Sequence, residues 1–257
     1  MSADYIDFIS HIKRKLGIDL TLYKEAQMKR RLTSLRNKRG FSTFNDYAQV
    51  LDKDEVLLQE FVDRLTINVS EFYRNPKRWH VLQDKILPAL LNKSTNLTVW
   101  SAACSTGEEP YSIAIMLREH FPHVNLRIIA TDIDGKVLEK AKRGIYQKQA
   151  LKELPFELKE KYFRCEHGLY YIDNRIKQMV TFKKHNLLVD RYPRNVDLIV
   201  CRNVLIYFTD QAKEIIYERF SDALVEKGVL FVGSTEQIFS PNQYHFSLLD
   251  TFFYTKE

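Results

Sequence analysis

Short apolar segments of strand length alternate with amphipathic segments of helix length from about residue 95 to the end of the chain. The apolar runs at 97–103 and 126–133 are each followed by a helical pattern, and the run at 196–203 is followed by a helical pattern and then by "GVLFVGSTE". This alternation predicts parallel strands with helical crossovers, hence an α/β fold with a doubly wound, mostly parallel sheet. Short alternating segments interrupt it at about 158–183 and predict a small antiparallel β insertion.

The preceding part of the chain contains helical patterns only. Met28, Leu32 and Leu35 recur at helical spacing, and Gly40 follows as a natural C-terminal stop. The next helical pattern begins after Ser42, a possible N-cap. We therefore expect a small all-α domain at 1–75, followed by the α/β domain at 76–257.

The composition is that of a soluble globular protein, with 45% hydrophobic and 28% charged residues in a chain of 257. Cys104, Cys165 and Cys201 are odd in number and far apart, which argues against a disulfide framework. Since no Cys or His pair has metal-ligand spacing, we expect no metal site. The sequence contains neither a signal-peptide pattern at its start nor an apolar run long enough to span a bilayer, so a cytoplasmic protein without membrane insertion is expected.

Positive charge is concentrated near the N-terminus. Residues 11–40 carry ten basic side chains and two acidic ones, a net charge of +8 against +6 for the whole chain. On a helical projection, Arg36 lies on one side of the apolar stripe, Arg31 on the other, and Arg30 points directly away from it, with almost no acids placed to neutralise them. This pattern is consistent with a docking surface for an acidic partner or with an ordinary solvated helix face.

Polar side chains follow the predicted strands, at the edge where open α/β sheets bind ligands. Glu109 follows the first strand, Asp132 the second, Asn186 the strand that ends near 184, and Asn203 and Tyr207 the strand at 196–203. No G-x-G-x-x-G or G-x-x-x-x-G-K-[ST] run is present to hold phosphates. The ligand is therefore expected to be a nucleoside without phosphates.

Two acids at consecutive strand ends narrow the expected class of ligand further. An acid after the second strand suits the hydroxyls of a ribose, as in dinucleotide folds, and an acidic first turn suits an ammonium or a sulfonium. S-adenosylmethionine combines these groups and has no phosphate. The alternative is that Glu109 and Asp132 are helix caps or surface acids.

Four motifs in this order resemble those of the CheR family of chemotaxis receptor methyltransferases. They are "TINVSEFYRN" at 66–75, "WSAACSTGEEPYS" at 100–112, "ATDID" at 130–134 and "CRNVLIYF" at 201–208. The resemblance covers nearly the whole chain. It implies a helical domain before a methyltransferase sheet with a small β-subdomain. It also implies transfer of a methyl from S-adenosylmethionine to glutamates of methyl-accepting chemoreceptors, giving methyl esters and S-adenosylhomocysteine.

The resemblance also assigns site residues. The predicted β insertion is a few residues shorter than in family members that dock a receptor's C-terminal pentapeptide. Ser70 stands where the family often has Thr. The cofactor-binding positions that it implies are Asn68, Ser70, Arg74, Glu109, Asp132, Asn186, Leu187, Asn203 and Val204.

Two side chains are candidates for catalysis. A glutamate carboxylate is ionised at pH 7 and needs no general base, so the reaction needs alignment and removal of water. Arg74 could hold one acceptor oxygen while the other attacks, and Tyr207 could donate a positioning hydrogen bond. Alternatively, Arg74 forms a structural ion pair and Tyr207 is a packed aromatic side chain.

The partner expected from the resemblance is the helical cytoplasmic domain of a chemoreceptor. That domain is an acidic rod, which Arg30, Arg31 and Arg36 could dock. A monomer that does not bind nucleic acid is expected. A nucleic-acid methyltransferase is a weaker alternative, because the Asn/Asp-Pro-Pro-aromatic motif is missing after the fourth strand. A non-catalytic adaptor with the same fold is the other.

Overall fold

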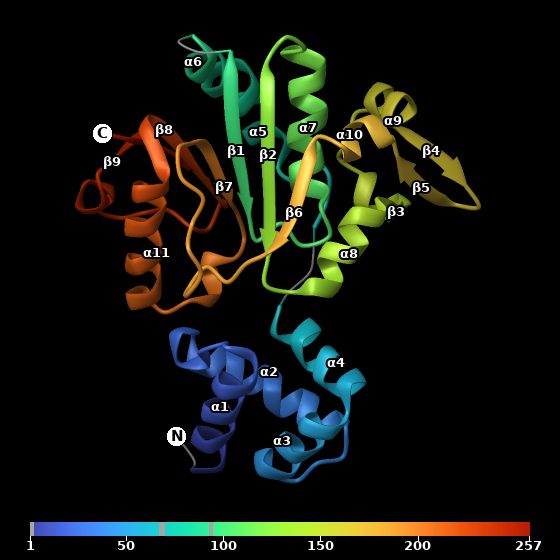
Figure 1. Ribbon diagram of the computed structural model, residues 1–257, viewed down its shortest axis with the longest axis vertical. Helices are drawn as coiled ribbons and strands as arrows, with labels where there is room; N and C mark the ends of the chain where they lie inside the picture. Colours follow the sequence, from blue (N-terminus) through green and yellow to red (C-terminus); the bar gives the residue numbers. More distant parts are fainter. Residues whose placement is uncertain (1–2, 67–69, 93–94) are drawn as a thin grey trace. The chain divides into compact units, whose positions relative to one another are not determined.

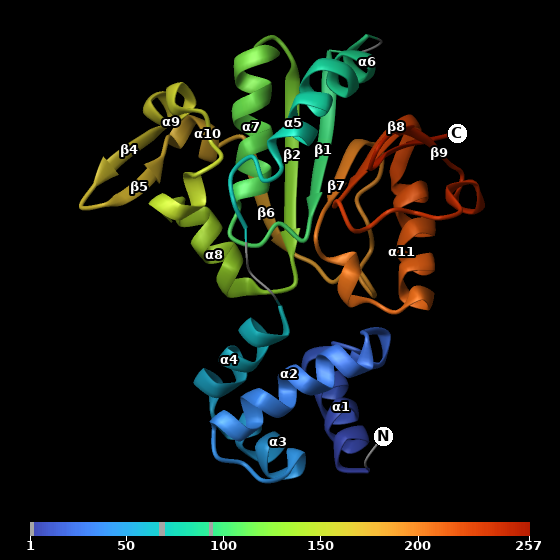
Figure 2. The same ribbon diagram turned by 180° about the vertical axis from the view of Figure 1, so that it is seen from behind.

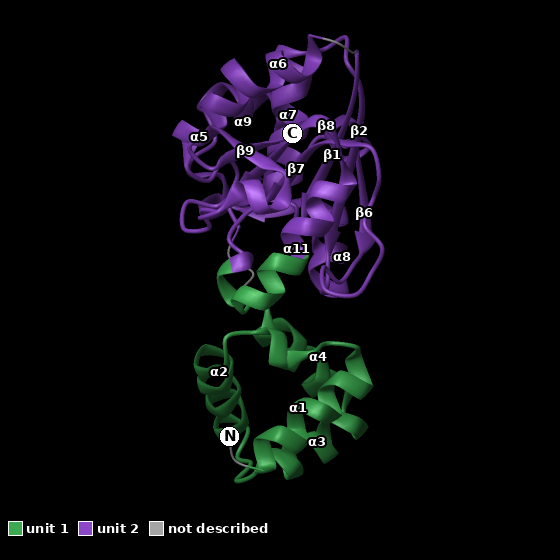
Figure 3. Ribbon diagram, turned by 90° about the vertical axis from the view of Figure 1, so that its left-hand side faces the viewer, with its two compact units in different colours: residues 1–68, 206–215 green, residues 69–205, 216–257 purple. Residues whose placement is uncertain are grey.

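The computed structural model describes residues 3–66, 70–92 and 95–257. Contacts divide the chain into two compact units (Figure 3). The first takes in residues 1–68 and 206–215, and the second takes in 69–205 and 216–257. The boundary predicted at 75 thus differs from the division at 68/69, and a segment from late in the chain belongs to the helical unit.

Helices make up the first unit, as the sequence predicts. Met28, Leu32 and Leu35 are buried, which confirms the apolar stripe. The side chain of Thr43, not that of Ser42, caps the third helix by accepting the N–H of Asp46 at 3.1 Å. Its elements are α1 (Ala3–Leu16), η1 (Leu20–Leu22), α2 (Glu25–Lys38), α3 (Phe44–Lys53) and α4 (Glu55–Leu65).

Backbone hydrogen bonds attach the segment 206–215 to this unit. The Lys24 N–H donates to the Tyr207 carbonyl at 2.9 Å, and the Thr209 N–H donates to the Leu22 carbonyl at 2.9 Å. Between them, Tyr23 and Phe208 form an isolated antiparallel bridge with their rings 4.8 Å apart. These pairings join residues distant in sequence, so no local pattern could predict them.

The second unit is built on a seven-stranded sheet in the order β6-β2-β1-β7-β8-β10-β9 (Figures 1 and 2). Its first five strands are parallel, which confirms the predicted doubly wound sheet. The last two form an antiparallel hairpin on the β8 edge, which was not predicted from the sequence. The strands are β1 (Asn96–Ala102), β2 (Asn125–Asp132), β6 (Val180–Lys184), β7 (Val196–Cys201), β8 (Leu224–Val232), β9 (Phe246–Asp250) and β10 (Phe253–Lys256).

A second, three-stranded antiparallel sheet has the order β3-β5-β4 and is the predicted β insertion. β4 (Phe163–Glu166) and β5 (Leu169–Ile172) turn through His167 and Gly168, both with positive φ. Its third strand, β3 (Ile145–Gln147), lies before the span predicted at 158–183. The last residues of that span belong to β6. This strand pairs in parallel with β2 and is therefore part of the main sheet, not of the insertion.

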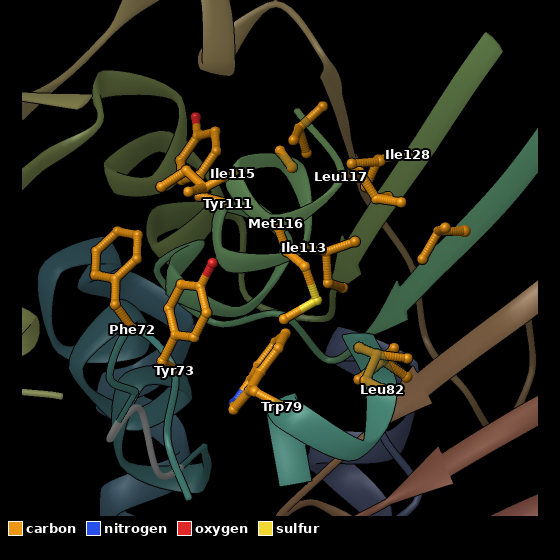
Figure 4. Close-up of a cluster of buried hydrophobic side chains, with 14 of the residues drawn as sticks. Phe72, Tyr73, Trp79, Leu82, Tyr111, Ile113, Ile115, Met116, Leu117 and Ile128 are labelled. Atoms are coloured by element: carbon orange, nitrogen blue, oxygen red, sulfur yellow. The ribbon is translucent and has the colours of Figure 1, made fainter. Parts of the chain in front are cut away.

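Helices cover the main sheet and complete its core. α6 contacts β1, and α7 and α8 contact β2 and β6. Figure 4 shows Tyr73 and Trp79 among the buried side chains beside Met116 of α7. The helical elements of this part of the chain are α5 (Pro76–Val81), the π-helical η2 (Leu82–Ile86), α6 (Leu87–Leu91), α7 (Glu108–His120), α8 (Gly135–Arg143), η3 (Lys148–Leu151), α9 (Phe156–Tyr162), α10 (Asn174–Lys177), η4 (Leu205–Tyr207), α11 (Asp210–Ala223) and η5 (Pro241–Tyr244).

Candidate functional site

The order of the strands locates the site within the second unit. From β1 the chain proceeds to β2 and β6 on one side, whereas β7 and β8 lie on the other. The order therefore reverses between β1 and β7, and ligands of open α/β sheets bind outside the carboxyl ends at such a point. Glu109, on the first turn of α7, and Arg202, directly after β7, form an ion pair there, with Oε2 and Nη1 3.7 Å apart.

The turn after β1 follows an unusual backbone path. Ala103, Ser105 and Gly107 all have positive φ, at 64°, 49° and 94°. A Cβ on Gly107 would lie 2.9 Å from the Cβ of Ala141, so both space and conformation require glycine. Left-handed residues gathered in one turn are typical of ligand clamps.

Asp132 ends β2 and uses its carboxylate to hold this turn. It is 6% exposed and accepts the N–H of Ser105 at 2.8 Å and that of Asp134 at 3.0 Å. Burial raises the pKa of Asp132 to about 6, while the backbone hydrogen bonds oppose the rise. The Ser105 N–H is therefore bound by a carboxylate of the protein itself. The remaining lone pairs of the Asp132 carboxylate can accept hydrogen bonds from hydroxyl groups such as those of a ribose.

The two adjacent glutamates of the turn have different surroundings. Glu109 accepts the Ser101 hydroxyl at 2.9 Å, and burial raises its pKa to about 7 against the charge of Arg202. Glu108 accepts the Thr106 hydroxyl at 2.7 Å, and burial raises its pKa against hydrogen bonds that include one from Ser70. Glu109 thus lies beside the strand-order reversal. Glu108 instead accepts hydrogen bonds from Thr106 in its own turn and from Ser70 in the linker, the segment 70–75 that carries Arg74.

The linker that carries Arg74 is fixed to the second unit. Tyr73 and Asn75, on either side of Arg74, have positive φ of 52° and 62°. The Arg74 carbonyl accepts Nε1 of Trp79 at 2.8 Å and Nη2 of Arg202 at 2.9 Å. The positive charge of Arg74 lowers the pKa of Glu109, in the same direction as Arg202. The half-buried linker arginine therefore lies within electrostatic range of the first-turn acid.

The strand that ends at 184 is followed by the predicted pair Asn186 and Leu187. The Asn186 side chain accepts the Leu188 N–H at 2.9 Å and so forms a local turn. Leu187 is buried, and its carbonyl accepts the hydroxyl of Tyr192 at 2.8 Å and Nη1 of Arg219 at 2.7 Å. The pair therefore lies on a hydrogen-bonded turn at the carboxyl end of β6.

The other predicted pair, Asn203 and Val204, follows β7. Asn203 has a positive φ of 62°, and its N–H donates to Oε2 of Glu236 at 2.6 Å. Glu236 belongs to the loop after β8 and is not among the site residues predicted from the sequence. The only signal available was an acid in "GSTE", directly after a predicted strand.

Tyr207 belongs to the first unit and packs against one of the three predicted docking arginines. The Arg31 guanidinium lies 5.5 Å from the centre of the Tyr207 ring, and its Nη1 donates to the Leu65 carbonyl at 2.9 Å. Arg36 lies over the Phe44 ring at 4.6 Å, whereas Arg30 is exposed. Arg31 and Arg36 therefore have packing roles that the helical projection does not show.

Three further findings concern a predicted site residue, metal binding and membrane-spanning helices. Asn68 lies outside the described residues. Across 3–66, 70–92 and 95–257, no group of three or more His, Cys, Asp or Glu side chains is arranged to hold a metal ion. Of the helices described in these ranges, none combines the length and apolar character needed to cross a membrane.

Comparisons with known proteins identify the family. The family described as "CheR methyltransferase, SAM binding domain" matches residues 68–253, and "CheR methyltransferase, all-alpha domain" matches residues 3–66. A chemotaxis protein methyltransferase of Listeria innocua is 45% identical over 257 residues, covering 100% of this chain and 98% of that protein. Another, of Escherichia coli K12, is 34% identical over 247 residues, covering 92% and 85%.

Among solved structures, PKMT2 from Rickettsia typhi in complex with AdoHcy is 16% identical, with a TM-score of 0.35 and coverage of 54% of this chain and 21% of that one. The family matches confirm the resemblance predicted from the four motifs. The chain belongs to the CheR methyltransferase family, with an S-adenosylmethionine-binding domain after an all-α domain.

Proposed function

We propose that this protein transfers a methyl group from S-adenosylmethionine to glutamate side chains of chemoreceptors and forms glutamate methyl esters. The observation that carries the proposal is the charge cluster at the strand-order reversal, in which the buried Arg202 pairs with Glu109 and the half-buried Arg74 lies within electrostatic range of both. An acid suited to a cationic cofactor and an arginine suited to a carboxylate acceptor within one cluster support this proposal.

The donor set fits the cofactor. Asp132 would hold the ribose hydroxyls and Glu109 the cationic end, because Asp132 is buried, the Glu109 side chain is only 13% exposed, and acidic groups stand where a phosphate site has N–H groups. When bound, S-adenosylmethionine supplies an activated methyl group. The other cofactor contacts in this proposal are Asn68, Ser70, Arg74, Asn186, Leu187, Asn203 and Val204.

The protein's own side chains would align the acceptor. An acceptor glutamate is ionised at neutral pH, so no group has to remove a proton from it. Arg74 would bind one carboxylate oxygen through its guanidinium and leave the other oxygen to attack in line. Its carbonyl is held by Trp79 and Arg202, which limits how far the Arg74 backbone can shift. Tyr207 would donate a hydrogen bond to the acceptor.

The proposed partner is the cytoplasmic helical domain of a chemoreceptor, and the proposed location is therefore the cytoplasm. Arg30 is the exposed member of the three predicted docking arginines, so it is the one that would meet an acidic rod most directly. Arg31 and Arg36 would contribute charge from packed positions.

The test is incubation with radiolabelled S-adenosylmethionine and receptor-containing membranes, followed by alkaline treatment. Release of volatile labelled methanol shows a methyl ester and supports the proposal. Label that resists alkali shows methylation of an amine or a nucleic acid and contradicts it. Cofactor binding without any labelled receptor identifies a non-catalytic adaptor and also contradicts it.

A further inference from the structure

The loop after β8 is bound to the turn after β7 through one buried carboxylate. Glu236 is 5% exposed, and its Oε2 accepts the N–H of Asn203 at 2.6 Å and the N–H of Gly233 at 2.8 Å. Its own N–H donates to the Gly233 carbonyl at 3.0 Å. A single oxygen therefore joins two chain segments at the carboxyl ends of neighbouring parallel strands.

Gly233 allows this close approach. A Cβ at Gly233 would lie 2.3 Å from Oε2 of Glu236 and 2.9 Å from the nitrogen of Asn203. Because no side chain fits in that space, the carboxylate and both N–H groups meet directly. The arrangement is a built feature of these two loops rather than a chance contact of an exposed acid.

The hydrogen bond from Asn203 stabilises a conformation that L-residues adopt reluctantly. Asn203 has a φ of 62°, in the left-handed region, where asparagine is tolerated better than most side chains. An ionised or polar acceptor at 2.6 Å fixes the direction of its N–H and hence the direction of its peptide plane. Because Val204 follows directly, the position of its backbone depends on the conformation held at Asn203.

Glu236 also contributes charge to the site. Burial raises the pKa of Glu109 and lowers the pKa of Arg202, and the negative charge of Glu236 favours the protonated form of both, so the three side chains interact electrostatically. The loop after β8 is thereby linked to the first-turn acid as well as to Asn203.

We propose that Glu236 is a positioning residue for cofactor binding, which acts by holding Asn203 and Val204 in the conformation that closes on the adenosine. This inference rests on the proposed function, in which those two residues contact the cofactor. Glu236 acts through the backbone of Asn203, so its effect is on affinity rather than on the methyl transfer itself.

The test compares Glu236→Ala, Glu236→Gln and a matched control by calorimetry with S-adenosylhomocysteine. Alanine removes the shared acceptor, so we expect affinity to fall about tenfold or more. Glutamine keeps one side-chain oxygen with two lone pairs, so it should restore the affinity to within about threefold of the wild type. The control is Asp197→Ala, because Asp197 accepts the Thr98 N–H at 2.7 Å across β7 and β1 but lies near the amino end of β7; its affinity should not change.

Kinetics supply a readout that a loss of fold would not give. The KM for S-adenosylmethionine should rise in Glu236→Ala while kcat at saturating cofactor stays within about threefold of the wild type. If Glu236→Ala does not fold, Glu236→Asp replaces it, since the shorter side chain cannot reach both N–H groups and should lose part of the affinity.

Two outcomes would overturn the inference. One is a folded alanine or aspartate variant with wild-type affinity. The other is a glutamine variant as weak as alanine, which would show that charge rather than backbone positioning matters. Failure of the proposed function would look different, because the wild type would then bind S-adenosylhomocysteine without releasing methanol from labelled receptors.

Discussion

Replacing Asp132 with alanine should weaken the binding of S-adenosylhomocysteine and destabilise the second unit at the same time. The Asp132 carboxylate accepts the Ser105 N–H at 2.8 Å and the Asp134 N–H at 3.0 Å. Alanine leaves both donors without this acceptor and removes the group proposed to bind the ribose. The substitution therefore has a structural effect and a binding effect, which must be measured separately.

The magnitudes follow from these contacts. A buried N–H that loses its acceptor costs about 1–3 kcal/mol, and water entering the space of the carboxylate offsets part of that cost, so the free energy of unfolding should fall by about 2–3 kcal/mol. Loss of hydrogen bonds from ribose hydroxyls to a charged group should weaken binding by about 1–3 kcal/mol, or about 5- to 150-fold in Kd.

The assay is calorimetric titration with S-adenosylhomocysteine alongside denaturant unfolding. Asp54→Ala is the matched control, because the Asp54 carboxylate also accepts two N–H groups, from Val56 and Leu57, each at 2.9 Å, but at the start of α4 in the helical unit. It should lose about 1 kcal/mol of stability and keep wild-type affinity. A folded Asp132→Ala variant with unchanged Kd would remove Asp132 from the binding site.

The remaining predictions concern pH, catalysis and docking. Burial raises the pKa of Glu109 to about 7, so affinity for S-adenosylhomocysteine should increase with pH through that value as the acid ionises, and in Glu109→Gln this step should be missing from calorimetric titrations. The same raised pKa means that Glu109 stabilises the ligand-free fold at low pH and that this contribution is lost as pH rises through about 7. Arg74→Ala should lower kcat for receptor methylation about 100-fold or more, with a much smaller change in Tm; a twofold change would exclude the proposed role. Tyr207→Phe should lower kcat with the fold intact, and turnover within a factor of two of the wild type would show only a packing role. Arg30→Glu should slow receptor methylation about 3- to 10-fold at low salt and less at high salt, whereas Lys53→Glu, an equal charge change on α3, should not.

The parallel sheet and the acids at its carboxyl edge could be predicted because both leave local patterns. Strands buried on both faces read as short apolar runs, and β1, β2 and β7 end in nearly continuous buried residues. The position of Asp132 and Glu109 then follows from the rule that all parallel strands present their carboxyl ends at one edge. Family resemblance added Arg74 and the two asparagine pairs, which no periodicity would have singled out.

The remaining features depend on contacts between distant parts of the chain. The terminal hairpin β9–β10 escaped prediction because Leu248 and Leu249, both substantially exposed on an edge strand, interrupt the apolar alternation. The helical projection placed Arg31 beside the apolar stripe but could not show its contacts, since it contains no information about the Leu65 carbonyl or the Tyr207 ring. Capping by Thr43 rather than Ser42 is a shift of one residue, which composition alone cannot resolve.

The acidity of the site follows from where the backbone N–H groups of the strand-end loops are directed. In a phosphate site such groups point at the ligand. Here the N–H of Ser105 is bound by Asp132, and the N–H groups of Asn203 and Gly233 are bound by Glu236. These carboxylates hold the loops in place. They also occupy the N–H groups that would otherwise attract an anion, and they add negative charge at the same positions. The strand–turn–helix geometry that would present free N–H groups to a pyrophosphate here presents carboxylates, which fits a cationic nucleoside better than an anionic one.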